Sequence, residues 1–148
     1  MTKLTFRDKE KKRYEELKPK LFSAEAQRNG TYRGLSRDFC LDDRYSAENL
    51  YFGIRDKAID YFLDRKIKWH DSKEQGRKPS NHLCCSQSCC VNFLFPLIQR
   101  PDLIKAIFGK YYPDMEAPLP VVEDKPLRDE THPFMAFESE HVIILERQ

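Results

Sequence analysis

The chain has 148 residues, of which 40% are hydrophobic and 34% are charged. This length suits one domain with its own core, and the balance excludes an intrinsically disordered chain. No apolar run is long enough to span a membrane, and the basic N-terminus lacks the apolar core of a secretion signal. Five cysteines, an odd number with adjacent pairs, do not suggest an extracellular disulfide framework, so we expect a cytoplasmic protein.

The formal net charge of +2 conceals an uneven distribution of charge along the chain. Residues 110–148 hold four basic and nine acidic residues, whereas residues 1–109 hold 22 basic and 15 acidic residues. A basic region of this kind is typical of nucleic-acid binding, although solvated lysine-rich helices have the same composition. The charge pattern therefore makes DNA a candidate partner without establishing it.

The first half of the chain predicts helices separated by a loop. Thr5 begins a capping pattern for a first helix, which Pro19 is expected to break or kink before a second short helix. Residues 31–45 show no periodicity and predict an ordered loop. Ser46 is expected to cap a longer amphipathic helix that ends near Lys66.

The second half begins with a polar surface loop and continues with two predicted helices. Ser80 is expected to cap a cysteine-rich helix that ends near Pro96, and Pro101 begins another helix. Residues 113–133 contain five prolines and cannot form one regular element. These patterns predict a helical region followed by a proline-rich connection.

Strand-like runs occur only after this connection, at residues 134–138 and 141–145, where they suggest a hairpin. The predicted fold class is therefore mainly α with a small C-terminal β element, an α+β chain. We expect three regions, which are an α-helical region (1–112), a proline-rich connection (113–133) and a short β element (134–148).

Four of the five cysteines lie close together, at positions 84, 85, 89 and 90. Cys85 and Cys89 would share one helical face, and thiolates are good zinc ligands. Neighbouring residues on a helix point about 100° apart, so the four thiols cannot converge on one ion. We expect buried thiols and no metal site, with a cysteine-ligated zinc module as the alternative.

Three polar residues interrupt the same apolar stretch. We expect them to be structural polar groups of the core, bonded to the backbone of the loops at 31–45 and 113–133. The alternative is that they orient a substrate or a catalytic group. The three residues are Ser86, Gln87 and Asn92.

The best candidate for nucleic-acid contact is the segment 65–78, which holds six basic residues and the only tryptophan. Cations can neutralise phosphates while an aromatic face stacks on a base. The alternative is that Ile67 and Trp69 anchor the end of the preceding helix in the core. The candidate contact residues are Lys66, Lys68, Trp69, Arg77 and Lys78.

Motifs of conventional enzymes are missing from the sequence. It contains no P-loop, GxGxxG, GxSxG or HExxH pattern. Glu138 and Glu140 would share one face of a strand, which could bind a metal ion but is more typical of a solvated strand edge. We therefore assign no catalytic and no metal-binding residue.

Several motifs occur in a recognisable order. The most specific are Ser80-Asn81-His82-Leu83, Ser86-Gln87 and Cys90-Val91-Asn92-Phe93-Leu94-Phe95-Pro96-Leu97, and weaker ones include Asn29-Gly30-Thr31-Tyr32, Glu48-Asn49-Leu50-Tyr51 and Ile67-Lys68-Trp69-His70. Together they resemble a family of prokaryotic restriction endonuclease-like proteins related to PD-(D/E)XK nucleases. The resemblance covers most of residues 5–138 and implies the helical N-terminal part of a nuclease-like fold.

The resemblance also implies metal-dependent DNA cleavage, with Mg²⁺ as the cofactor of an intact family member. In the family, the catalytic Asp and Glu-x-Lys follow a Phe-Glu like Phe137-Glu138. Here no aspartate follows Glu138, and no Glu-x-Lys follows a predicted strand.

We therefore expect a truncated or degenerate member in which the catalytic β core is missing. Such a chain would be inactive alone, with no cofactor of its own and at most weak DNA binding. The alternative is a small module that binds nucleic acid or a partner chain, the partner covering the exposed core.

Overall fold

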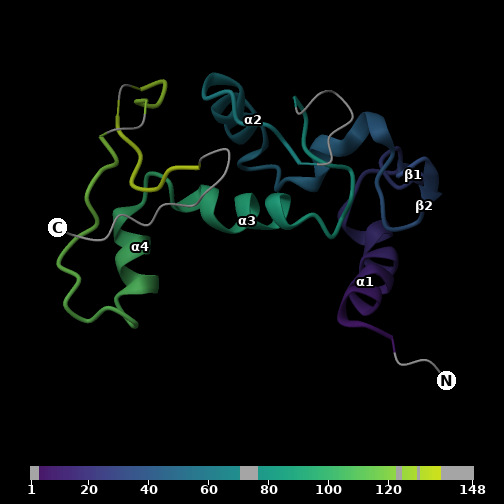
Figure 1. The fold of residues 1–148 in the computed structure, drawn as a ribbon, viewed down its shortest axis with the longest axis horizontal. Coiled ribbons are helices and arrows are strands. Elements are labelled where there is room, and N and C mark those ends of the chain that lie inside the picture. Colours follow the sequence, from purple (N-terminus) through teal and green to yellow (C-terminus); the bar gives the residue numbers. More distant parts are fainter. Residues whose placement is uncertain (1–3, 71–76, 123–124, 130, 138–148) are drawn as a thin grey trace.

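The computed structural model describes residues 4–70, 77–122, 125–129 and 131–137. These residues are mainly helical and include one small antiparallel sheet, which confirms the predicted class. The helices and strands are α1 (Phe6–Leu21), β1 (Gly30–Tyr32), β2 (Leu35–Arg37), the 3-10 helix η1 (Asp43–Asn49), α2 (Arg55–Asp64), α3 (Ser86–Leu94), the 3-10 helix η2 (Phe95–Leu97) and α4 (Pro101–Phe108) (Figure 1).

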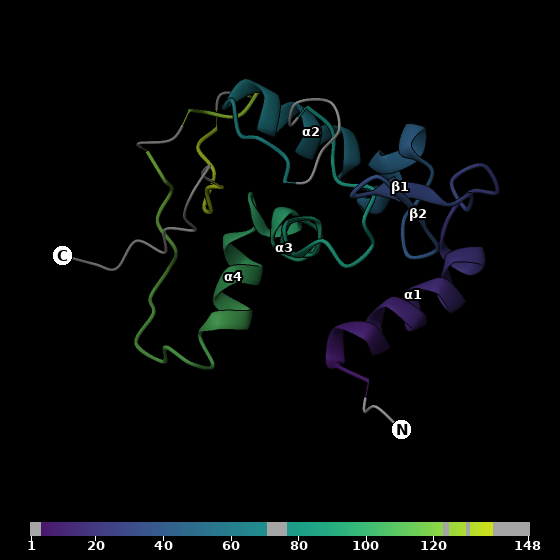
Figure 2. The same ribbon diagram turned by 45° about the vertical axis from the view of Figure 1, so that its right-hand side comes forward.

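Helix α3 lies at the centre of the molecule (Figures 1 and 2). In both views α2 lies above it, α1 and the β1–β2 hairpin lie at one end, and α4 lies at the other end. Among the described residues, none of the helices combines the length and apolarity needed to cross a bilayer.

The main hydrophobic core joins α2 to α3 and to the chain that follows each of them. Phe62 and Trp69 form its most closely stacked ring pair, with centroids 4.0 Å apart and planes inclined by 14°. Burial of such large rings removes much apolar surface from water and is the main stabilising contribution here. The core residues are Leu50, Ile54, Ala58, Tyr61, Phe62, Ile67, Trp69, Val91, Phe95, Ile98 and Phe137.

A second, smaller cluster joins α1 to the hairpin region. Its buried residues are Ala26, Leu41 and Leu83, and Tyr14 and Phe22 pack against them. This cluster fixes the end of α1 beside the hairpin, so both elements belong to one end of the molecule.

The predicted break at Pro19 does not occur, because α1 continues through Pro19 to Leu21. Pro19 has no N–H to donate, so the helix lacks one backbone hydrogen bond at this position, close to its C-terminal end. The amide of Phe22 still donates to the carbonyl of Lys18 at 3.3 Å, which closes the last turn.

Helix α2 ends at Asp64, and the next residues form a Schellman motif. The amide of Lys66 donates to the carbonyl of Leu63 at 3.1 Å, and the amide of Ile67 donates to the carbonyl of Phe62 at 2.8 Å. Lys66 has a φ of 58°, the left-handed conformation that this motif requires and that glycine adopts most easily. The prediction that this helix ends near Lys66 is therefore confirmed.

We predict that Lys66→Gly raises the free energy of unfolding by about 1 kcal/mol, because glycine has no side chain to strain at positive φ. The matched control is Lys68→Gly, in the same segment but without a positive φ. Urea unfolding should show stabilisation for the first variant and none for the control. Equal midpoints for the two variants would contradict this account of the turn.

Helix α3 begins at Ser86 instead of the predicted Ser80. Residues 81–83 pair with another part of the chain, and a turn then leads into the helix, closed by a bond from the amide of Cys85 to the carbonyl of His82 at 3.0 Å. The amide of Leu41 donates to the carbonyl of Asn81 at 2.9 Å, and the amide of Leu83 donates to the carbonyl of Phe39 at 3.1 Å. These long-range bonds outweigh the local helical preference.

Residues 31–45, predicted to be a loop, instead contain the β1–β2 hairpin and the start of η1. The strands are antiparallel, and the register pairs Tyr32 with Leu35 across a turn formed by Arg33 and Gly34. Asp42 caps η1 with a bond from the amide of Arg44, so Ser46 is not a helix cap. Strands of three residues are too short to show the alternation of apolar and polar residues that predicts a strand.

After α4, the described residues contain no helix or strand. This part of the chain returns to the core, where the amide of Phe134 donates to the carbonyl of Ile98 at 2.8 Å. The amide of Phe137 donates to the hydroxyl oxygen of Tyr61 at 3.2 Å. Residues 134–137 are therefore packed without strand pairing, and the run 141–145 lies outside the described residues.

Candidate nucleic-acid interface

The tryptophan of the predicted DNA-binding segment belongs to the core. Trp69 is only 3% exposed and stacks on Phe62, and Ile67 is also buried. A base cannot reach the face of a ring that is already stacked inside the protein. In this structure Trp69 anchors the segment and is not available for base stacking.

Four cations of the segment have exposed side chains. Lys66 and Lys68 alternate with the buried Ile67 and Trp69, so burial of the apolar residues leaves the cations in solvent. Arg77 and Lys78 are also exposed and precede the buried Pro79. Residues 71–76, between the two pairs, lie outside the described residues. We call Lys66, Lys68, Arg77 and Lys78 the segment cations.

Helix α3 holds the backbone of this segment through Gln87. The side-chain amide nitrogen of Gln87 donates to the carbonyl of Lys68 at 3.0 Å. Its side-chain oxygen accepts from the amide of His70 at 2.6 Å. This two-way contact resembles the pairing of a strand, and it fixes the backbone at residues 68–70, beside Lys66 and Lys68.

Asn92, also on α3, makes the same kind of two-way contact with the backbone of residues 49–51. Its side-chain oxygen accepts from the amide of Tyr51 at 2.8 Å, and its nitrogen donates to the carbonyl of Asn49 at 2.9 Å. Gln87 and Asn92 thus bond to backbone, as expected of structural groups, but at residues 68–70 and 49–51 instead of the loops named above. Ser86, the third member of that set, is exposed.

Two buried asparagines that occur in the motifs above, but to which the sequence assigned no role, connect these elements. The side-chain nitrogen of Asn81 donates to the carbonyl of Leu41 at 3.0 Å and to a carboxylate oxygen of Asp43 at 2.7 Å. The side chain of Asn49 donates to the carbonyls of Ser80 and His82 at 2.9 and 3.0 Å. Polar residues inside an otherwise apolar stretch were the signal that could have identified them.

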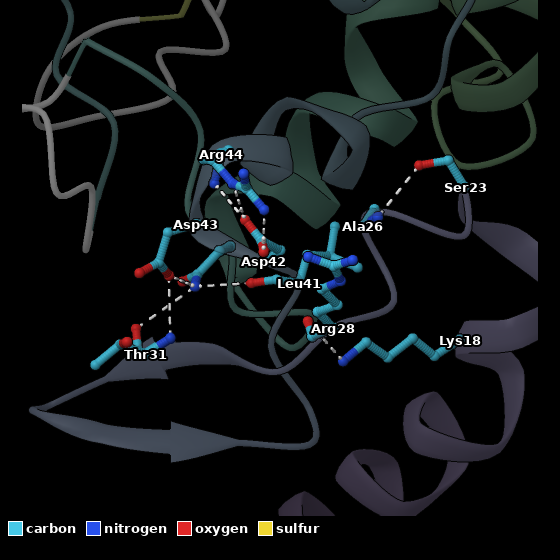
Figure 3. Close-up of polar contacts among 10 residues, drawn as sticks. Lys18, Ser23, Ala26, Arg28, Thr31, Leu41, Asp42, Asp43 and Arg44 are labelled. Carbon is cyan, nitrogen blue, oxygen red and sulfur yellow. Dashed lines mark hydrogen bonds and ion pairs between the residues drawn. The ribbon is translucent and has the colours of Figure 1, made fainter.

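Lys18 is the most heavily bonded cation of the described chain and is 5% exposed. Its ammonium donates to the carbonyls of Arg28, Asp38 and Cys40 at 3.4, 3.1 and 2.6 Å, and to the side-chain oxygen of Asn29 at 3.3 Å. Burial lowers its pKa, while the nearby Cys40 and Asp38 act in the opposite direction. Figure 3 shows this side chain reaching from α1 to the hairpin region.

Carboxylates close to the hairpin are engaged by neighbouring donors (Figure 3). Hydrogen bonds from Arg44 lower the pKa of Asp42 to about 2. This contribution to stability is present above the ordinary value of 3.8 and is lost as the pH falls toward 2. A carboxylate oxygen of Asp43 accepts from the amide of Thr31 at 3.0 Å.

The expectation of buried thiols is correct for Cys85 but wrong for Cys89, and Cys84 and Cys90 are half-buried. Cys85 is buried and Cys89 is exposed, although they are one helical turn apart. Burial raises the pKa of Cys84 and of Cys90. Among the described residues, no three His, Cys, Asp or Glu side chains lie together in a way that could hold a metal ion.

An Asp followed by a Glu-x-Lys, the order of groups in the nuclease motif, does occur in this sequence, but outside any predicted strand. Pro113-Asp114 precedes Glu123-Asp124-Lys125, a Glu-x-Lys string. Such a motif needs two adjacent strands to bring its groups together, and residues 113–122 and 125–129 contain no strand. A second Glu-x-Lys, Glu10-Lys11-Lys12, begins on α1, so the string alone is not specific. Residues 123–124 and the earlier candidates Glu138 and Glu140 lie outside the described residues.

Comparison with known proteins gives a family. The family model REase-ARP, described as Restriction Endonuclease associating with ARP, matches residues 6–138. No curated protein and no solved structure matches the chain. The matched region includes every helix and strand described above, and it confirms the restriction endonuclease-like resemblance seen in the sequence. This chain therefore belongs to the REase-ARP family, a restriction endonuclease-associated family.

Proposed function

We propose that the helical region at 1–112 binds duplex DNA and that the segment cations supply the phosphate contacts. Membership of a restriction endonuclease family is the observation that carries the proposal. The exposure of these four cations supports it, and Trp69 and Gln87 hold the backbone beside Lys66 and Lys68. Because phosphate contacts carry no sequence information, the contribution of the segment cations is independent of sequence.

We further propose that this chain does not cleave DNA by itself. Metal-dependent cleavage needs carboxylates that hold Mg²⁺ against the scissile phosphate. The described sheet is a single hairpin, Gly30–Tyr32 with Leu35–Arg37, and neither strand contains a carboxylate. These features support a chain that supplies DNA contacts without a catalytic carboxylate pair on its described sheet.

A cytoplasmic location belongs to the same proposal. None of the five cysteines, all within the described residues, forms a disulfide. Thiols of this number are typical of a reducing compartment, which is also where a restriction endonuclease meets DNA.

A protein partner is the second candidate function, and the family description itself speaks of association with ARP. Tyr51 and Phe52 are exposed with ring centroids 4.7 Å apart, and the exposed Phe93 follows Asn92, which bonds to the amide of Tyr51. Exposed aromatic side chains near one another are typical of protein contact surfaces.

We predict that Lys68→Ala combined with Arg77→Ala lowers the affinity for duplex DNA and reduces the slope of log K against log salt by about two units. Fluorescence anisotropy with a labelled duplex measures both quantities. The matched control is Lys105→Ala combined with Lys110→Ala, which removes the same charge at α4 and just beyond it. If the two double variants behave alike, the segment cations are only a solvated part of the surface.

We predict no cleavage of plasmid or linear DNA with Mg²⁺ or Mn²⁺. Cleavage that survives repurification and disappears with EDTA would contradict the proposal. In that case, loss of cleavage in Asp114→Asn and Lys125→Ala would place the site at residues 114–125. Loss of cleavage in Glu138→Gln would instead place it at Glu138.

A further inference from the structure

The β1–β2 hairpin carries an arginine at its tip in a conformation that arginine rarely adopts. Arg33 and Gly34 are the two turn residues between Tyr32 and Leu35, and their φ values are 51° and 77°. Positive φ at both central residues is the pattern of a type I′ turn, in which asparagine and glycine are preferred. An arginine held there is a backbone outlier of the kind that points to function.

Two more arginines flank this tip. Arg28 precedes the hairpin and is exposed, and Arg37 is the last residue of β2. The guanidinium of Arg37 lies 6.0 Å from the ring centroid of Phe39. Its Nε is buried and has no hydrogen-bond partner in the described part of the chain. The hairpin and its flanks therefore present several guanidinium groups.

The neighbouring carboxylates bond to donors other than these three arginines. Asp38 accepts from the side-chain amide of Asn29, and Asp42 pairs with Arg44 at 3.1 Å. Asp43 accepts from the amide of Thr31 and from Asn81. Arg28 contributes to the lowered pKa of Asp42, and the guanidinium of Arg33 lies 5.3 Å from the ring centroid of Tyr32. Within the described residues no ion pair joins either arginine to these carboxylates, so a ligand can still reach their N–H groups.

The hairpin is held rigidly on the body of the protein. The ring of Tyr32 packs edge-on against the buried His82 at 4.7 Å, and Phe39 packs against the same ring at 4.9 Å. Leu35, the partner of Tyr32 in the register, is 56% exposed beside Arg33. A preorganised tip with one cation and one apolar side chain loses little conformational freedom on binding.

We propose that this hairpin enters the major groove of duplex DNA, with Arg33 donating to base edges and Arg28 contacting a phosphate. A two-stranded antiparallel ribbon is one of the elements that the major groove admits, and arginine is the commonest donor to guanine there. The inference rests on the proposed DNA binding and adds a second contact surface, distinct from the segment cations. It also supplies the sequence preference that phosphate contacts lack.

The test uses three single variants of the full chain. Arg33→Asn removes the cation and installs a residue that the turn prefers, so its Tm should equal or exceed that of the parent. Arg33→Lys keeps the charge but loses the planar fork that recognises guanine. Lys110→Asn makes the same charge change as Arg33→Asn just after α4, and α4 lies at the end of the molecule away from the hairpin (Figure 1).

Anisotropy titrations with labelled duplexes of different sequence and with single-stranded DNA give the affinities. We expect Arg33→Asn to weaken duplex binding about tenfold and single-strand binding much less. Arg33→Lys should retain most of the affinity but lose any preference among duplex sequences. Lys110→Asn should stay within about twofold of the parent.

The outcomes separate this inference from the proposed function. If the parent binds duplex DNA but Arg33→Asn matches Lys110→Asn, the hairpin inference is overturned and the role of the segment cations stands. Equal losses on duplex and single-stranded DNA would also overturn it, because they indicate a phosphate contact only. A parent chain that does not bind duplex DNA at low salt overturns both.

Discussion

Gly30→Ala is expected to lower the free energy of unfolding by about 3 kcal/mol, a large part of the stability of a domain of this size. A Cβ at this position would lie 1.8 Å from the carbonyl oxygen of Leu41 and 2.4 Å from the side-chain nitrogen of Asn81. Both neighbours are fixed, the first by backbone and the second by its bond to Asp43. The hairpin must therefore move away from the chain that supports it.

Gly34→Ala is the matched control for this prediction. Its φ of 77° strains any side chain, but a Cβ there would meet no atom within 4 Å. We expect a cost of about 1 kcal/mol from backbone strain alone. Urea unfolding of the two variants should give clearly different midpoints. Equal losses would contradict the close packing of Gly30 against Leu41.

Lys18→Met is expected to destabilise the fold by about 3 kcal/mol. The substitution keeps the length of the side chain and removes the ammonium. It leaves the carbonyls of Arg28, Asp38 and Cys40 without the donor that now joins them. Unsatisfied buried carbonyls carry the full cost of their lost hydration, so the effect exceeds that of an ordinary surface lysine.

Lys20→Met is the control, because Lys20 is exposed on the same helix two residues later. Its midpoint in urea should lie within about 0.5 kcal/mol of the parent. A similarly small loss for Lys18→Met would show that water replaces the ammonium without cost and that α1 is not held by this contact.

The elements that the sequence predicted correctly are those with strong local signals. Pro101 begins α4 as expected, and the end of α2 near Lys66 followed from the loss of periodicity. The β1–β2 hairpin was missed because each strand has only three residues, although Arg33-Gly34 is an acceptable turn. The start of α3 was placed too early because residues 81–83 pair with residues 39–41 and a turn follows them before the helix begins.

The candidate interface was predictable only in part, for a similar reason. Composition located the segment cations, but it could not tell an aromatic residue that contacts DNA from one that anchors the core. The stacking of Trp69 on Phe62 decides this question, and it depends on a helix that ends between the two residues. The role of Lys18 was also hidden, since a lysine on a basic helix is ordinarily solvated.

The most direct test of the account is a titration of the parent chain with duplex DNA at 50 and 200 mM salt. If the four segment cations contact phosphates, the affinity should fall by about 10² between the two concentrations, because each contact releases roughly 0.9 counterions. Mg²⁺ is omitted, so that binding is measured without any cleavage. Salt-dependent binding of this size supports a DNA-binding member of the family. No binding at 50 mM salt, or an affinity that does not change with salt, would contradict it.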